Sequence, residues 1–158
     1  MPENFTVIEL LNSFTTMFFM TWLAITDFYK FKLPNKIIGS WIICRTALIA
    51  ASVVAEGSLS IVFSSIGGAV FIGTMLLAIH LLSKEMLGGG DVKLGFAMGF
   101  ALMFEAAFLA VVLGLLFAAA FEAFRILLRS KNLMSNLPLG VFLFFGVIGA
   151  YVLNYVFL

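Results

Sequence analysis

Residues 94–128 read LGFAMGFALMFEAAFLAVVLGLLFAAAFEAFRILL, and this stretch decides the fold of the chain. A helix needs about 20 apolar residues to cross the hydrocarbon core of a membrane, so the stretch is too long for one crossing. Its first third carries an acidic residue, Glu105, which is costly in the middle of a bilayer. Two arrangements are therefore open: one long helix, or two helices joined by a turn near Glu105.

The composition places the whole chain in a membrane. Of its 158 residues, 63% are hydrophobic and only 11% are charged, whereas a soluble domain is about half apolar and about a quarter charged. Four further segments are long and apolar enough to cross a bilayer: residues 5–26, 37–55, 59–82 and 139–158. The sequence thus predicts an all-α, polytopic membrane protein with a single domain, residues 1–158, surrounded by membrane lipids.

The basic residues decide between the two arrangements, because short cytoplasmic loops collect Lys and Arg. The clusters are Lys30, Lys32 and Lys36; Lys84 and Lys93; and Arg125, Arg129 and Lys131. A turn at Glu105 puts all three clusters on one side, whereas a single crossing puts the last cluster on the wrong side. We therefore expect six transmembrane helices in the cell inner membrane with both termini outside, the fourth spanning residues 91–103 and the fifth residues 106–128.

Several classes of site are not supported by the sequence. No basic run is interleaved with aromatic residues on a polar background, so we expect no nucleic-acid partner. Cys44 is the only cysteine and His80 the only histidine, so neither a disulfide, a cysteine zinc site nor a histidine metal site is predicted. We assign no role to His80, expect neither metal nor organic cofactor, and find no indication of a particular oligomeric state.

Two aspartates stand at the predicted cytoplasmic ends of helices. Asp27 ends the first helix, and Asp91 follows three glycines at the start of the fourth. Carboxylates at membrane depth are costly unless they are paired, solvated or functional. When two carboxyl groups share one proton, one can activate water while the other protonates or hydrogen-bonds a scissile carbonyl. The pair therefore points to an aspartyl peptidase.

The residues around Asp91 are suited to binding an extended peptide. Gly88, Gly89 and Gly90 disfavour a helix and leave room for a substrate strand to approach the backbone. Lys93, two residues after Asp91, could hold a substrate carbonyl, although a solvated lysine at the membrane interface is an equal alternative. An ordinary tight turn is the alternative reading of the glycine run.

These motifs together resemble the type IV prepilin peptidases, over nearly the whole chain. The matching residues are Asp27; Leu33, Pro34 and Asn35; Gly88 to Leu94; and Leu137, Pro138, Leu139 and Gly140. The resemblance implies that Asp27 and Asp91, the latter in a Gly-any-Gly-Asp motif, are the catalytic pair and face the cytoplasm. It also implies that the substrate is a type IV pilin-like precursor, a prepilin or pseudopilin, whose short basic leader is removed.

Within that family the chain resembles the short, peptidase-only branch that serves tight-adherence (Flp) pili or archaeal filaments. The large bifunctional members carry an extra N-terminal region with paired cysteines and a methyltransferase activity. This chain has one cysteine, so we expect no methyl transfer. Because the leader of the substrate is basic, the acidic Glu85 is a candidate for its recognition, in addition to Gly88–Gly90 and Lys93.

Two other functions stay open from the residues. One is a small proton-coupled transporter, and the other is an inactive factor in pilus assembly or protein secretion. The glycine run and the placement of both acids at one membrane face favour the peptidase, because transporter carboxylates more often lie near the midplane.

Two structural features are also expected. Arg45 lies inside the second helix and should form an ion pair, for which Glu122 is a possible partner. The spacing of Gly95 with Gly99, and of residues 67–68 with Gly73, is typical of closely packed membrane helices.

Overall fold

The computed structural model describes residues 7–57, 59–82, 88–127 and 138–157, and its secondary structure there is helical. The helices are α1 (Val7–Lys30), α2 (Asn35–Glu56), α3 (Ser60–Leu82), α4 (Gly89–Leu127) and α5 (Leu139–Phe157). Among the described residues, the first four are long and apolar enough to cross a membrane, and α5 contributes a shorter apolar helix. The prediction of an all-α membrane protein is confirmed.

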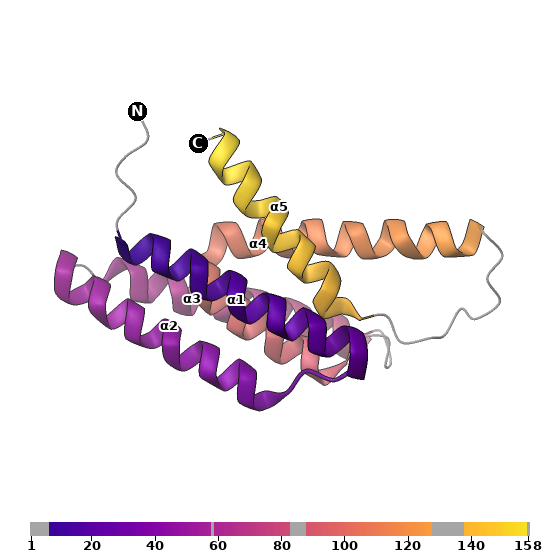
Figure 1. Ribbon diagram of the computed structural model, residues 1–158, viewed down its shortest axis with the longest axis horizontal. Helices are drawn as coiled ribbons and strands as arrows, with labels where there is room; N and C mark the ends of the chain where they lie inside the picture. The colour runs from indigo at the N-terminus through magenta and orange to yellow at the C-terminus, as the bar shows by residue number, and fades with distance from the viewer. Residues whose placement is uncertain (1–6, 58, 83–87, 128–137, 158) are drawn as a thin grey trace.

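Helix α4 is broken at Met103, two residues before Glu105 and at the predicted end of the fourth helix. The backbone of Met103 has φ 62° and ψ −175°, a conformation that is almost restricted to glycine and costs about 1–3 kcal/mol. Figure 1 shows the consequence: the first arm of α4 runs away from its start at Gly89, and the second arm turns back. The long stretch around Glu105 therefore forms two helical arms rather than one straight helix.

Glycines bring the first arm of α4 into backbone contact with α3. A Cβ atom built on Gly68 would lie 2.5 Å from the carbonyl oxygen of Gly99 and 2.7 Å from the main-chain carbon of Met103. The prediction of close packing is confirmed for Gly68 and Gly99, which meet each other's main chain. It is also confirmed for Gly73, which meets Phe96, and for Gly95, which meets Leu76. It is wrong for Gly67, which has open space around its Cβ position because it points away from α4.

The second arm of α4 packs against α5 in the same way. A Cβ atom on Gly114 would lie 3.0 Å from the Cα of Leu143, and one on Gly146 would collide with the main chain at Ala110. Each arm of α4 thus packs closely against one neighbouring helix through glycine residues. Such contacts suit a membrane, where helices associate through close packing rather than through the hydrophobic effect.

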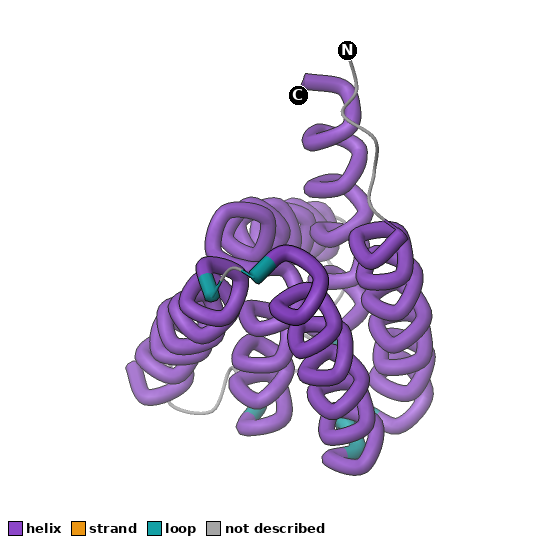
Figure 2. Tube along the Cα trace, turned by 90° about the vertical axis from the view of Figure 1, so that its left-hand side faces the viewer, coloured by secondary structure: helices purple, strands orange, loops and turns teal. Residues whose placement is uncertain are grey.

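The ends of α1 and α2 have clear local causes. Helix α1 continues to Lys30, one turn beyond its predicted end at Asp27, and Phe31, with φ 48°, then leaves the helix. Pro34 precedes α2, and Gly57 follows it in the left-handed conformation, with its N–H donated to the carbonyl of Val53. Figure 2 shows that loops are confined to the ends of the bundle.

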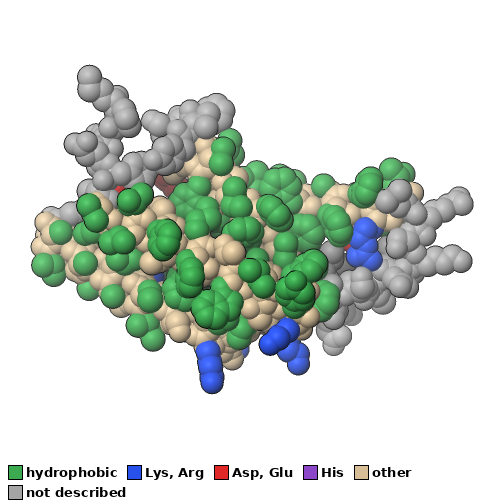
Figure 3. Space-filling view, viewed as in Figure 1, with side chains coloured by type: hydrophobic (Ala, Val, Ile, Leu, Met, Phe, Trp, Pro, Cys, Tyr) green, Lys and Arg blue, Asp and Glu red, His purple; other side chains and the backbone are tan. Residues whose placement is uncertain are grey.

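The outer surface of the bundle is apolar. Large hydrophobic side chains are exposed along every helix, for example Phe14 and Phe63 at 70% and 72% of their area. Figure 3 shows that hydrophobic side chains cover most of the visible face and that the few basic side chains lie at its margin. A soluble protein rarely exposes apolar area of this extent, and a bilayer covers it without cost.

We expect Gly68→Ala to lower the melting temperature in detergent, because the new methyl group overlaps the main chain of α4. Overpacking of this kind costs about 1–3 kcal/mol. The control is Gly67→Ala on the same helix, where nothing lies within 4 Å of the new Cβ. Equal melting temperatures for the two variants would contradict the packing described here.

Candidate active site

Asp27 lies in the last turns of α1 on the face that packs against the core. The buried positions of this helix are Thr16, Met20, Leu23, Ala24 and Asp27, a spacing of three and four residues that marks one face. The Asp27 side chain is 5% exposed, and its Oδ2 accepts a 2.8 Å hydrogen bond from the main-chain N–H of Gly140. Asp27 is therefore inside α1 and bonded to the first turn of α5, rather than at the end of its helix.

Asp91 lies in the first turn of α4 and caps its own helix. Its Oδ2 accepts a 3.0 Å hydrogen bond from the N–H of Gly88, and its own N–H donates to the carbonyl of Gly88 at 3.0 Å. Asp91 is the third helical residue, and its carboxylate reaches back to the N–H of the residue before the helix, as in one half of a capping box. Gly88 has no side chain to supply the other half. The local sequence alone therefore orients the Asp91 carboxyl group.

The three glycines before Asp91 differ in how much room they have. A Cβ on Gly88 would lie 3.2 Å from Oδ2 of Asp91, and one on Gly90 would lie 3.3 Å from the Cβ of Leu33, whereas Gly89 has open space. Gly89 and Gly90 also begin α4, so the expectation that the run stays outside the helix is wrong for these two. The first turn tolerates them because a helix start needs few backbone bonds of its own.

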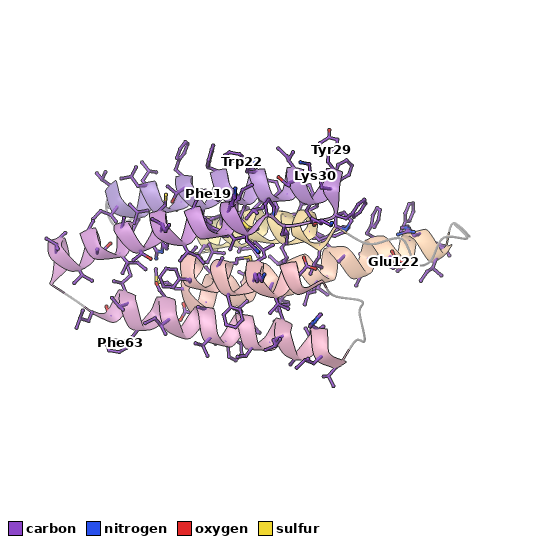
Figure 4. The ribbon with its side chains drawn as sticks, turned by 90° about the horizontal axis from the view of Figure 1, so that it is seen from below. Phe19, Trp22, Tyr29, Lys30, Phe63 and Glu122 are labelled. Atoms are coloured by element: carbon purple, nitrogen blue, oxygen red, sulfur yellow. The ribbon has the colours of Figure 1, made fainter. Side chains whose placement is uncertain are left out.

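The two aspartates lie at the same end of the bundle. Their carboxyl groups are close enough to interact electrostatically. Figure 4 shows Tyr29 and Lys30, just after Asp27 in the chain, at the end opposite Phe63 of α3. The contact of Gly90 with Leu33 brings the start of α4 to the connection between α1 and α2 at this end. The predicted neighbourhood of the two acids is thus present in the structure.

A cleft of about 350 Å³ opens beside Asp91. Its walls come from the connection between α1 and α2, from the start of α2, and from the glycine run with the first turn of α4. They comprise Phe31, Lys32, Leu33, Asn35, Gly88, Gly89, Gly90, Asp91 and Lys93. The volume is within the range of small ligand sites, about 300–1,000 Å³. Four of the five predicted substrate-binding residues line this cleft.

Lys93 bridges the cleft to α2. Its Nζ donates a 3.1 Å hydrogen bond to Oδ1 of Asn35, the first residue of that helix. The bond holds the lysine at the rim of the cleft, where its remaining donors are available to a bound peptide. The fifth predicted substrate-binding residue, Glu85, lies outside the described residues.

A second hollow, of about 410 Å³, lies on the outer face of α1 and differs in character. It is lined by residues of that helix alone: Phe14, Met17, Phe18, Thr21, Trp22 and Ile25. Figure 4 shows Trp22 pointing away from the bundle. This face lies opposite Asp27 on the helix and has no ionisable group, so it offers no chemistry of its own.

Arg45 does not pair with Glu122, so that expectation is wrong. Glu122 accepts a 3.2 Å hydrogen bond from Arg125, three residues further along α4. Arg45 is 2% exposed and lies near Tyr151 of α5, and its Nε and Nη2 have no hydrogen-bond partner within the described part of the chain. The pairing could not be read from sequence because it depends on which part of α4 packs against α2, and helical spacing alone does not fix this.

Two residues of the site had no assigned role in the sequence. His80, near the end of α3, lies within electrostatic range of Asp91. Gly140 supplies the N–H that binds Asp27; the sequence signal was the run Leu137 to Gly140 before the last helix, but nothing in it specified a contact with α1. Among the described residues, no group of three or more His, Cys, Asp and Glu side chains could hold a metal ion.

Comparison with known proteins gives one match. The type IV leader peptidase family matches residues 14–123, which include α1 from Phe14, both aspartates and most of α4. Comparison with curated proteins and with solved structures gave no match. The family match covers well over half of the chain.

Proposed function

The chain belongs to the type IV leader peptidase family, and from this premise we propose that it is an intramembrane aspartyl endopeptidase with Asp27 and Asp91 as its catalytic pair. The substrate we propose is a type IV pilin-like precursor, from which the enzyme removes the basic leader. The observation that carries the proposal is that the two aspartates lie at one end of the bundle, where Asp91 forms part of the wall of the glycine-lined cleft.

The proposed reaction uses the pair as one acid–base unit. One carboxylate takes a proton from a water molecule, and the resulting hydroxide adds to the scissile carbonyl carbon while the other, protonated carboxyl donates to the carbonyl oxygen. The carboxyl group that took the proton from water then donates it to the amide nitrogen, while the other carboxylate accepts a proton from a hydroxyl group of the tetrahedral intermediate, and the C–N bond breaks. Two like charges about 4 Å apart repel by about 4 kcal/mol at an effective dielectric near 20, which favours sharing of one proton.

The cleft suits an extended peptide. Gly89 and Gly90 remove side chains from one wall, and the first turn of α4 leaves main-chain N–H groups without partners inside the helix. Lys93 and Lys32 add donors at the rim. We propose that the residues around the scissile bond lie here with their carbonyl groups toward these donors, as a strand adds to exposed backbone. Glu85 remains the candidate for the basic leader.

The proposed orientation places this site in the cytoplasm. Lys30, Lys32, Lys36 and Lys93 lie at the end of the bundle that carries the aspartates, which is the arrangement that the positive-inside rule gives for cytoplasmic loops. With the break at Met103 counted as a turn, the chain crosses the inner membrane six times and has both termini outside. We propose no methyltransferase activity and no cofactor.

The orientation is tested with membrane vesicles. We expect a soluble precursor peptide to be cleaved by inside-out vesicles and to be left intact by sealed right-side-out vesicles, because only the former expose the cytoplasmic end. Detergent, added to both as the control, should equalise the two rates. Cleavage by sealed right-side-out vesicles alone would reverse the proposed topology.

The catalytic pair is tested by replacing each carboxyl with an amide of the same shape. Asp27→Asn and Asp91→Asn should each lower cleavage of a co-expressed pilin-like precursor by at least about 10²-fold, because an amide can neither accept nor donate the catalytic proton. Cleavage is read by gel shift and N-terminal sequencing, and Glu122→Gln serves as the control. If either aspartate variant keeps full activity, the assignment is wrong; if the wild type cleaves no such precursor, the carrier and assembly-factor functions take precedence.

The glycine run yields a graded prediction. Gly89→Ala should be the least impaired of the three variants, because its Cβ meets no protein atom within 4 Å and only narrows the space for the peptide. Gly88→Ala should lower cleavage because its Cβ crowds Oδ2 of Asp91, and Gly90→Ala because its Cβ presses on Leu33 at the cleft wall. The measurement is the initial rate at matched protein levels in membranes. A Gly89→Ala variant as impaired as the other two would contradict this account of the cleft.

A further inference from the structure

The carboxyl group of Asp27 is oriented by a helix that comes from the other end of the chain. The donor is the main-chain N–H of Gly140, 113 residues away, and the bond is buried. The side chain of Asp91, by contrast, is oriented by its own helix start. The contact therefore makes the direction of the Asp27 carboxyl group depend on the position of α5.

The N–H of Gly140 is available because of its position in α5. The helix begins at Leu139. In its first turn the N–H of Val141 donates to the carbonyl of Pro138 at 3.1 Å. The N–H groups of the first helical residues have no acceptor within the helix and must find one elsewhere. Pro138 has no N–H to satisfy and presets the backbone for a helix start. Gly140 therefore donates to Asp27.

Only glycine allows this approach. A Cβ on residue 140 would lie 2.9 Å from Oδ2 of Asp27 and 3.3 Å from both its Cβ and its Cγ. The crowded atoms belong to a short, buried side chain, which cannot move aside without changing the direction of the carboxyl group. The positive end of the α5 dipole also faces this carboxyl, which strengthens the bond to an anionic oxygen.

The start of α5 is itself held in place. Leu139 is 8% exposed and Leu143 is fully buried, and Gly114 of α4 lies against the backbone of Leu143. The donor is thus mounted on the rigid pair formed by α5 and the second arm of α4. Among the described residues, no hydrogen bond is made to the other carboxyl oxygen, Oδ1 of Asp27. The bond to Gly140 therefore fixes one of the two carboxyl oxygens of Asp27.

We propose that Gly140 is a positioning residue of the peptidase, whose main-chain N–H fixes Oδ2 of Asp27 and so aims Oδ1 at the catalytic water. The inference rests on the proposed function for its effect on the rate, but the contact itself does not. A displacement of about 1 Å in a catalytic group can lower a rate by about 10²-fold, with little effect on substrate binding at a separate cleft wall. The cleft walls do not include residue 140.

The test compares Gly140→Ala with Gly149→Ala, a control on the same helix whose Cβ meets only the tip of the Leu113 side chain. Gly140→Ala should lower kcat about 10²-fold and leave KM within about twofold of the wild type, whereas Gly149→Ala should change neither. A purely structural defect would instead lower the amount of folded Gly140→Ala protein in membranes or raise its KM. An unchanged kcat in Gly140→Ala would overturn the proposal.

Infrared spectroscopy separates this inference from the proposed function. In protein labelled with ¹³C at the aspartate carboxyl carbons, the band of Asp27 is assigned by its loss in Asp27→Asn. It should shift in Gly140→Ala and stay in place in Gly149→Ala, whether or not any precursor is cleaved. A band that does not move in Gly140→Ala would overturn the positioning role even if the enzyme is an active peptidase.

If Gly140→Ala does not accumulate in membranes, the same hydrogen bond can be tested by changing its acceptor, Asp27. Asn at position 27 keeps an acceptor for the N–H of Gly140, whereas Leu has the same shape and no acceptor. We expect Asp27→Leu to melt at a lower temperature than Asp27→Asn, because it leaves a buried donor unpaired. Equal melting temperatures would overturn the proposal.

Discussion

The hydrogen bond from the N–H of Gly140 to Oδ2 of Asp27 is the contact on which the arrangement of the site depends. A carboxyl group in an apolar setting is tolerated only when it is hydrogen-bonded or paired, and the N–H groups in the first turn of a helix need an acceptor outside that helix. Each group satisfies the other. Because the partners belong to α1 and α5, the first and last described helices must be docked for the bond to form.

The carboxyl group of Asp91 finds its hydrogen-bond donor within its own helix start. Its helix, α4, is broken, and the two arms of α4 pack against different helices. Asp91 caps the start of α4 through Gly88 and needs no other helix for its orientation. The first arm of α4 packs against α3 at Gly68 and Gly99. The second arm packs against α5, which donates a hydrogen bond to Asp27 of α1. The backbone at Met103 therefore links the arm that begins at Asp91 to the arm that packs against α5, the helix whose N–H binds Asp27.

The features that the sequence predicted well are those that local composition controls. Apolar length gave the helices, charge placement gave the break near Glu105, and the resemblance to leader peptidases agrees with the family match. The features that it missed depend on which helices meet. Arg45 lies by Tyr151 rather than Glu122, Gly67 points outward although Gly68 does not, and the contact of Gly140 with Asp27 joins residues 113 positions apart. Helical spacing fixes a face, but the partner of that face is set by the packing of the whole bundle.

The central claim is that Asp27 and Asp91 form one catalytic centre, and an affinity label tests it most directly. A peptide epoxide built on the leader junction of a precursor is opened by a catalytic carboxylate, with a neighbouring acid supplying the proton, and it leaves an ester that mass spectrometry can locate. We expect one label per protein, on Asp27 or Asp91, and we expect labelling to be lost when the other aspartate is changed to Asn. A label on a different residue, or one that persists without the second aspartate, would contradict it.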